Sequence, residues 1–215
     1  HYPLRRQRQM CIRDRLFAGL LANPALAHHP LGGEVPQTMM HGLLSGIGHP
    51  IIGFDHLAFV LGIGLLAAFQ RSRLALPAGF VGGTVAGTLL IIGGVALPAV
   101  ELVITLSVLM VGLVATTGRN LKALPAAGLA GLAGVFHGWA YGEAVVGAEA
   151  SPIIAYLAGF GLVQMVIATG VMVLAVMMKD GKSTALMPRF AGAMVAGVGL
   201  TYLVEIAETA VFAGI

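Results

Sequence analysis

The chain has 215 residues, of which 58% are hydrophobic and only 10% are charged, and its mean hydropathy is +0.92. Soluble domains average about 25% charged residues, so this composition excludes an ordinary soluble domain and is typical of a polytopic membrane protein. The single cysteine, Cys11, excludes a disulfide framework or a thiolate metal cluster within one chain.

The first 27 residues have the pattern of a cleavable leader. A basic region precedes a short apolar run, residues 16–21, and Ala25-Leu26-Ala27 is a typical cleavage site; the basic residues are Arg5, Arg6, Arg8, Arg13 and Arg15. We expect cleavage after Ala27; the alternative is an irregular cytoplasmic tail. Cleavage would remove five of the 12 basic residues and one of the nine acidic residues, leaving 7 basic and 8 acidic. The formal charge of +3 therefore gives no support for a nucleic-acid partner.

Six apolar segments follow, each near the roughly 20 residues that a helix needs to cross a bilayer. They are residues 51–69, 76–97, 99–117, 123–141, 152–178 and 189–213. The connections between them are too short to separate two domains. We therefore expect residues 28–215 to form one all-α bundle of six transmembrane helices in a lipid bilayer. The 31 glycines suit helix packing in lipid, either within one chain or in a homo-oligomer.

Basic residues mark one side of the membrane. All seven that follow the leader lie in, or directly beside, the connections after the first, third and fifth segments: Arg71, Arg73, Arg119, Lys122, Lys179, Lys182 and Arg189. Cytoplasmic loops carry such an excess of Lys and Arg, so we expect this side to be cytoplasmic. The mature N-terminus and the C-terminus would then lie outside.

Acidic residues and histidines gather toward the opposite, outer side. Asp55 and His56 lie near the start of the first segment, Glu101 near the start of the third, and His137 near the end of the fourth. A charged group inside a membrane helix costs about 2.5–3.5 kcal/mol on insertion scales. Protonation, a water-filled vestibule or a bound cation would each reduce that cost. Histidine beside carboxylate favours a cation such as Zn, Ni, Co or Cu.

The stretch HPIIGFDH, residues 49–56, predicts a broken helix. In one regular helix, His49 and His56 would lie two turns, about 10.5 Å, apart, too far to bind one ion directly. Pro50 and Gly53 permit a break, and irregular backbone at membrane depth is tolerated where it lines a cavity. We expect His49, Asp55 and His56 to surround an ion path. The alternative is a capping histidine and a partly exposed Asp-His pair at the interface.

The fourth segment leads to another histidine. Gly128, Gly131 and Gly134 recur every three residues up to His137, which predicts a close helix contact below the imidazole. A satisfied packing histidine is the alternative for His137. Trp139 and Tyr141 are typical interfacial anchors, and Glu143 follows them.

Two further pairs carry ligand-type side chains. Glu205 and Glu208 share a face of the last segment, as release-path groups or as an interfacial pair. Cleavage after Ala27 would place His28 and His29 at the new N-terminus, where they could capture a divalent metal.

Motifs of covalent or nucleotide chemistry are missing from the sequence. It has no HExxH, no GxSxG, no P-loop and no dinucleotide fingerprint, so we expect neither an enzyme nor an organic cofactor. Haem ligation by His56 and His137 is conceivable, but the surrounding acids argue against it.

Three stretches resemble the HupE/UreJ family of nickel and cobalt permeases. The family pattern HPxxGxDH matches residues 49–56, the stretch HGxAxGE at residues 137–143 is similar to a second family pattern, and residues 101–109 are similar to the family's third-helix signature. The resemblance implies secondary transport of Ni²⁺ or Co²⁺ into the cell, serving hydrogenase, urease or cobalamin enzymes.

The leading hypothesis is a six-helix permease of the bacterial inner membrane, with periplasmic termini. Capture would involve His28 and His29, entry His49, Asp55 and His56, and the binding site His137 and Glu101, with Glu143, Glu205 or Glu208 assisting. Without a nucleotide motif, the membrane potential or a proton gradient must drive uptake; 100 mV supplies about 4.6 kcal/mol to a 2+ ion. The sequence does not choose between Ni²⁺ and Co²⁺.

Two alternatives stay open. A membrane-bound accessory protein could store or hand over the ion without translocating it. The cytoplasmic halves favour this slightly, because they carry few polar groups beyond Ser107, Thr116, Thr117 and Gln164. A membrane-embedded enzyme with a hydrolytic metal site is the weaker alternative, since it would need a metal-bound water beside a substrate groove.

Overall fold

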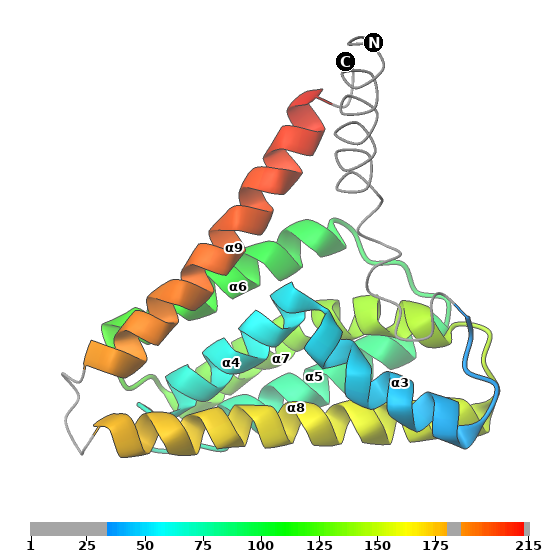
Figure 1. Cartoon of the computed structure of the whole chain (residues 1–215), viewed down its shortest axis with the longest axis horizontal. Helices are drawn as coiled ribbons and strands as arrows, with labels where there is room; N and C mark the ends of the chain where they lie inside the picture. Colours follow the sequence, from blue (N-terminus) through cyan, green and yellow to red (C-terminus); the bar gives the residue numbers. More distant parts are fainter. Residues whose placement is uncertain (1–33, 180–185, 213–215) are drawn as a thin grey trace, which may run out of the picture.

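The computed structural model describes residues 34–179 and 186–212, and every regular element within them is a helix (Figure 1). The helices are α3 (Met39–Ile52), α4 (Phe54–Ala67), α5 (Ala75–Ile92), α6 (Val100–Thr117), α7 (Ala123–Gly142), the short 3-10 helix η1 (Glu143–Val145), α8 (Ala150–Lys179) and α9 (Leu186–Phe212). Helices α5 to α9 are each long and apolar enough to cross a bilayer. The bent pair α3 and α4 makes six spans if it counts as one, so the all-α, multi-pass membrane bundle is confirmed.

The first apolar segment is broken, as the stretch HPIIGFDH predicted. Helix α3 begins after Thr38, whose side chain accepts a hydrogen bond from the His41 N–H, and it ends at Ile52 just beyond Pro50. Gly53 then adopts an extended conformation, φ −71° and ψ 101°, and α4 starts at the next residue. The two helices meet at 78°. The helical segment therefore begins at Met39 rather than at residue 51, because the 14 residues before the break form a helix too.

The second segment is shorter than expected. Helix α5 stops at Ile92, five residues before the expected end at 97, because the chain turns at Gly93 and Gly94. Gly94 has φ 81°, in the left-handed region that glycine adopts without steric cost.

Helices α5 and α7 pack with their backbones in close contact. A Cβ atom on Gly83 or Gly87 of α5 would collide with backbone atoms of α7, and one on Gly138 would collide with the carbonyl of Thr84. The glycine stripe predicted on α7 is thus right for Gly134, which meets the Phe80 carbonyl. It is wrong for Gly128, where an added Cβ would meet nothing within 4 Å. Small residues let these two helices approach as they do in other membrane bundles.

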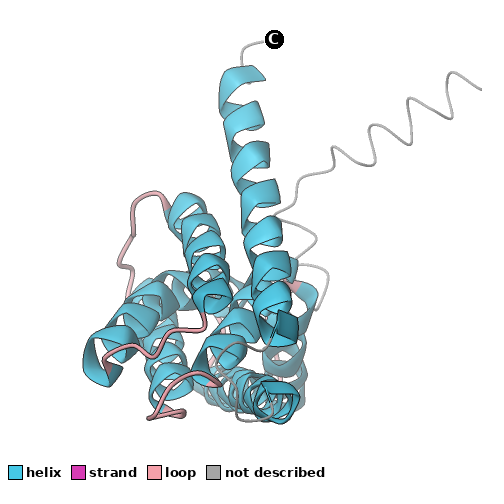
Figure 2. Ribbon diagram, turned by 90° about the vertical axis from the view of Figure 1, so that its left-hand side faces the viewer, coloured by secondary structure: helices cyan, strands magenta, loops and turns pink. Residues whose placement is uncertain are grey.

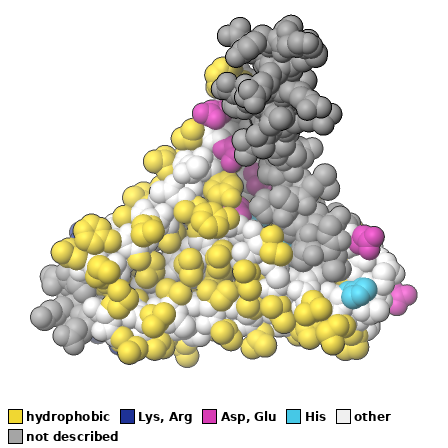
Figure 3. All heavy atoms as spheres, viewed as in Figure 1, with side chains coloured by type: hydrophobic (Ala, Val, Ile, Leu, Met, Phe, Trp, Pro, Cys, Tyr) yellow, Lys and Arg dark blue, Asp and Glu magenta, His cyan; other side chains and the backbone are white. Residues whose placement is uncertain are grey.

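Helix α4 lies at the centre of the bundle and contacts α6, α8 and α9 (Figure 1). Most of its residues are buried, including Phe59 and Ile63. On the outside, hydrophobic side chains are spread over the described part of the face that Figure 3 shows. Leu162, Leu174 and Met194 are each more than 60% exposed. Such a surface would promote aggregation in water and is the expected surface of a bundle in lipid.

Helix α9 is packed most closely along its first half. Its buried residues run from Pro188 to Gly199, and they lie against α6. The remainder of the helix rises away from the other helices (Figure 2). Glu205 and Glu208 lie on this exposed second half.

Candidate functional site

Three histidines from three helices meet where α3 and α4 are broken apart. His49 of α3, His56 of α4 and His137 of α7 are all buried, with exposed fractions of 3%, 6% and 0%. The ring centroids of His49 and His56 are 6.4 Å apart, and those of His56 and His137 are 5.0 Å apart. The bend at Gly53 folds His49 back toward His56, so two residues that a straight helix would separate by two turns become neighbours. A Cβ on Gly53 would lie 2.8 Å from Cδ2 of His56, so glycine is needed here for close packing.

A tyrosine fixes the protonation of His49. The Tyr156 hydroxyl of α8 donates its hydrogen to the backbone carbonyl of Tyr141 at 2.7 Å. It therefore accepts the second hydrogen bond, 2.8 Å from Nδ1 of His49. A neutral imidazole carries one N–H, and here that hydrogen is on Nδ1. The lone pair of the His49 ring is then on Nε2.

A serine fixes His56 through His137. Ser107 of α6 donates its hydroxyl hydrogen to the Ile104 carbonyl at 2.6 Å, so its oxygen accepts from Nε2 of His137 at 2.9 Å. With its proton on Nε2, His137 accepts at Nδ1, and the Nδ1 of His56, 2.9 Å away, is the donor. His56, like His49, is left with its lone pair on Nε2. Two independent chains of hydrogen bonds thus select the same tautomer at both rings.

Aromatic rings enclose the cluster. The ring of Tyr141 lies 4.9 Å from His49 and 4.4 Å from His56, and Phe59 lies 4.4 Å from His137. Tyr141 is completely buried, and its hydroxyl has no hydrogen-bond partner among the described residues. The expectation of an interfacial anchor is therefore wrong for Tyr141. Its spacing of four residues from His137 places both on one face of α7, which is the signal that could have identified it.

Tyr156 was not identified as a site residue from the sequence. No motif surrounds it, and its role depends on how α8 packs against α3. A Cβ on Gly46 of α3 would collide with the Tyr156 carbonyl, so the two backbones are in close contact there. Only the three-dimensional packing brings the Tyr156 hydroxyl to His49.

Asp55 belongs to the same region but acts on the backbone. It is 7% exposed, and its Oδ1 accepts a hydrogen bond from the His56 N–H at 2.8 Å. As an acid in the first turn of α4, it satisfies an N–H that has no partner within the helix and stabilises the positive end of the helix dipole. Asp55 therefore stabilises the start of the helix that carries His56.

The other expected ligands do not join the histidines. Glu101, in the first turn of α6, and Glu143, in η1, are exposed, as are Glu205 and Glu208 on the free half of α9. His28 and His29 lie outside the described residues. Within the described ranges, no three His, Cys, Asp or Glu side chains form a group that could hold a metal ion. The structure brings together His49, His56, His137 and Asp55, and leaves the glutamates at the edges.

Comparison with known proteins gives two matches. The family described as "HupE / UreJ protein" matches residues 16–202 of this chain. Protein HupE of Rhizobium leguminosarum bv. viciae is 32% identical over 196 residues, which cover 86% of this chain and 93% of that protein. No solved structure matches the chain.

Proposed function

Because this chain belongs to the HupE/UreJ family, we propose that it takes up Ni²⁺ or Co²⁺ across the inner membrane through the buried histidine cluster. The observation that carries the proposal is the shared tautomer of His49 and His56, both of which have their lone pair on Nε2. Imidazole nitrogen is a suitable ligand for Ni and Co, and the resemblance of the sequence motifs to the family implies the same two metals.

The separation of the two ring centroids is just within the limit for one shared ion, which would then have the two imidazoles on nearly opposite sides. With metal–nitrogen bonds of about 2.1 Å, two imidazoles on one ion have ring centroids at most about 6.5 Å apart. The centroids of His49 and His56 are 6.4 Å apart. A straight helix would exceed that limit, so the break at Pro50 and Gly53 is what makes a shared ion possible.

The surrounding hydrogen bonds have the arrangement that metal-binding histidines require. A ligand imidazole usually donates its other N–H to an oxygen or a similar acceptor, which fixes the ring and its tautomer. Tyr156 supplies that acceptor for His49, and His137 supplies it for His56. In this proposal His137 and Ser107 orient a ligand and do not bind the ion themselves.

A site with two histidines is suited to an ion that must leave again. Water would fill the remaining positions around the metal, so binding would be strong enough for entry and weak enough for release. The exposed Glu101 and Glu143 would attract the ion to the outer edge of the bundle.

The charge distribution supports inward transport. The Arg71 N–H donates to Asn120 at 3.0 Å, and Arg189 donates to the Thr116 carbonyl, so the basic connections lie close together at one end of the bundle. With that end in the cytoplasm, a potential of 100 mV, negative inside, would supply about 4.6 kcal/mol to a 2+ ion.

Proteoliposomes test the proposal. Purified protein is reconstituted, an inside-negative potential is imposed, and accumulation of ⁶³Ni²⁺ and ⁵⁷Co²⁺ is measured for wild type and for His56→Gln. Potential-dependent accumulation that His56→Gln abolishes is the expected result. Binding without accumulation would contradict transport and would instead fit a metal-binding accessory protein.

A further inference from the structure

An apolar groove runs between α6 and α7 in the half of the bundle that leads to the basic connections. Its volume is about 340 Å³. Its floor is buried and includes Phe59, Ile63 and Leu66 of α4. Its rims include Met110 of α6 and Leu129 of α7, which are 55% and 69% exposed. The α6–α7 groove is therefore a hollow in the lipid-facing surface and not an enclosed cavity.

Small side chains on α7 leave room for the groove. Ala126, Ala130 and Ala133 line it, and their spacings of four and three residues place them on one face of the helix. Ser107 of α6 has the only polar side chain among the described residues that line the groove. Its hydroxyl is already hydrogen-bonded to a carbonyl of its own helix and to His137. The groove thus suits a hydrocarbon chain and offers nothing to a polar ligand.

The groove has the length of part of an acyl chain within one leaflet. Along α4 its lining runs from Phe59 to Leu66, and along α7 from Ala126 to Ala133. Each of these distances is about 10.5 Å at a rise of 1.5 Å per residue. One leaflet contributes about 15 Å, half of the 30 Å hydrocarbon core. The groove ends at Leu121, in the connection between α6 and α7, so it lies in the leaflet on the side of the basic connections.

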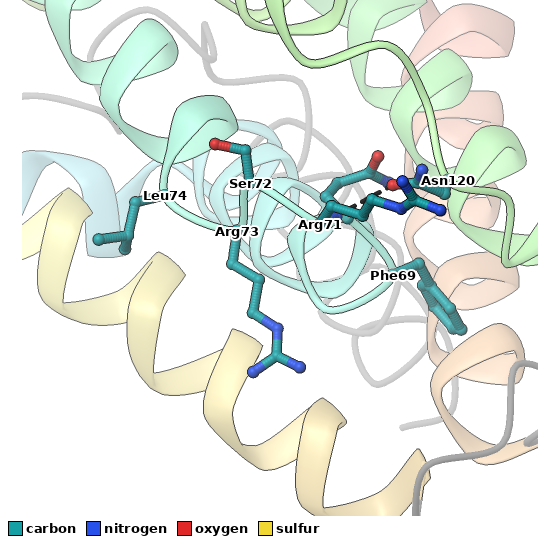
Figure 4. A pocket seen from close by; sticks show the side chains of 7 residues that line it. Phe69, Arg71, Ser72, Arg73, Leu74 and Asn120 are labelled. Atoms are coloured by element: carbon teal, nitrogen blue, oxygen red, sulfur yellow. Dashed lines mark hydrogen bonds between the residues drawn. The ribbon is translucent and has the colours of Figure 1, made fainter.

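Cationic side chains surround this end of the groove. Arg119 and Lys122 are both exposed, and they lie in the connection that joins α6 to α7. The backbone N–H of Arg71 donates to Oδ1 of Asn120 in the same connection at 3.0 Å. Figure 4 shows the Arg71 side chain extending beside Asn120. Three basic residues from two connections are thus gathered where the groove ends.

Gln70 joins the groove to a basic pocket. Its side-chain nitrogen donates to the carbonyls of Leu66 and Arg119 at 3.0 and 3.1 Å, and its oxygen accepts from the Leu121 N–H at 2.7 Å. Leu66 and Leu121 line the groove, whereas Gln70 lines a surface pocket of about 670 Å³ (Figure 4). The described residues of that pocket include Arg71 and no Asp or Glu. The pocket therefore begins where the groove ends, and its charge favours an anion.

We propose that an anionic phospholipid binds here, with an acyl chain in the α6–α7 groove and its phosphate beside Arg71, Arg119 and Lys122. Guanidinium groups bind phosphate oxygens through paired hydrogen bonds. With the basic connections in the cytoplasm, as their charge predicts, the groove lies in the leaflet whose surface is negative, and basic pockets between membrane helices on that side bind lipid headgroups. A free anion would leave the groove uncovered, and a neutral lipid would leave the basic residues without a counter-charge.

Native mass spectrometry of the full chain in detergent tests the site, because it counts the lipids that stay bound. The probes are phosphatidylglycerol and phosphatidylcholine with identical acyl chains. We expect one phosphatidylglycerol to bind about tenfold or more tightly than phosphatidylcholine, and glycerol phosphate in tenfold excess not to displace it. Equal affinities for the two lipids would overturn the proposal. Displacement by glycerol phosphate would overturn it too, in favour of a site for a free anion.

Two arginines of one connection test the headgroup position. Arg71→Gln removes a charge beside Asn120 and should weaken phosphatidylglycerol binding about fivefold or more. Arg73→Gln is the matched control, because Arg73 lines the same pocket but points toward α8 in Figure 4. This control should change the affinity less than twofold. Equal losses in the two variants would overturn the proposed site, since the lipid would then respond only to the total charge at this end.

A larger side chain in the groove tests the acyl-chain position. Ala133→Leu fills the groove and should weaken phosphatidylglycerol binding about tenfold or more. Gly128→Leu places the same side chain on the same helix, where an added Cβ meets nothing within 4 Å, and should bind like wild type. Circular dichroism checks that both variants are folded; Ala130→Val, a smaller change in the same wall, replaces Ala133→Leu if that variant does not fold. Unchanged affinity in the folded groove variant would overturn the proposal.

Discussion

The rings of His49 and His56 lie edge-on to each other at a 78° helix break, with their centroids 6.4 Å apart and their planes at 68°. They belong to one sequence motif but to two helices. Tyr156 is hydrogen-bonded to the first ring and His137 to the second, and under the proposed function these bonds would orient both rings toward one ion.

The break depends on the missing side chain of Gly53. In Gly53→Ala the new Cβ would lie 2.8 Å from the ring of His56 and would displace it. We expect nickel affinity to fall at least about tenfold, as it does for other changes that reorient metal ligands. Isothermal titration measures the affinity, with Gly170→Ala as the control, since an added Cβ there meets nothing within 4 Å. Equal affinities for the two variants would show that the Gly53 contact does not position His56.

The hydroxyl of Tyr156 is expected to matter more than its ring. Tyr156→Phe leaves Nδ1 of His49 without its acceptor in a buried site, which costs about 1–3 kcal/mol of stability. It also frees His49 to place its proton on Nε2, so nickel affinity should fall by about tenfold or more. Thermal unfolding and nickel titration check the two effects. Thr169→Val, on the same helix, removes a hydroxyl that donates to carbonyls of its own helix and should change neither.

Ser107 is expected to act on His56 indirectly, through His137. Ser107→Ala takes away the acceptor for Nε2–H of His137, so His137 no longer holds one tautomer and His56 loses its fixed donor role. Potential-driven uptake should fall about tenfold or more. The control is Thr201→Ala, whose hydroxyl bonds only a carbonyl of its own helix. An unchanged rate in Ser107→Ala would remove Ser107 and His137 from the proposed relay.

Alanine substitutions at two adjacent glycines of α5 distinguish the effect of helix packing from the effect of helix propensity. Gly83→Ala forces a Cβ against the Gly131 carbonyl and should destabilise the bundle by about 1–3 kcal/mol. Gly82→Ala meets nothing within 4 Å and should be neutral or stabilising by up to about 1 kcal/mol, since alanine favours a helix. Thermal unfolding in detergent compares them. Equal melting temperatures would mean that α5 and α7 can separate without cost.

Much of this architecture could be predicted from the sequence because lipid imposes simple rules. The length of the apolar segments predicted the membrane-spanning helices. Pro50 and Gly53 predicted the break between α3 and α4, since both residues disfavour a continuous helix. The surroundings of the glutamate side chains were harder to predict. Position along a helix sets depth in the membrane, but not the direction in which a side chain points or how far the helix is packed. Glu205 and Glu208 lie beyond Gly199, where α9 leaves the bundle.

The burial of Tyr141 and Tyr156 also depends on how the helices pack, which the sequence pattern does not show. A tyrosine near a helix end is usually an interfacial anchor. The spacing of four residues places Tyr141 on the face of His137, but it does not show that neighbouring helices enclose that face. Tyr141 is buried because its ring packs against His49 of α3, His56 of α4 and Phe160 of α8. Tyr156 reaches His49 because α3 lies on α8. These are contacts between helices distant in sequence, so they were not predicted.

X-ray absorption at the nickel edge tests the shared ion most directly. Purified wild-type protein is loaded with one equivalent of Ni²⁺ and compared with His49→Gln and His56→Gln. We predict two imidazole nitrogens at about 2.1 Å in wild type, with oxygen completing the shell, and one imidazole in each variant. An unchanged number of imidazoles in either variant, or none in wild type, would contradict a nickel ion held between His49 and His56.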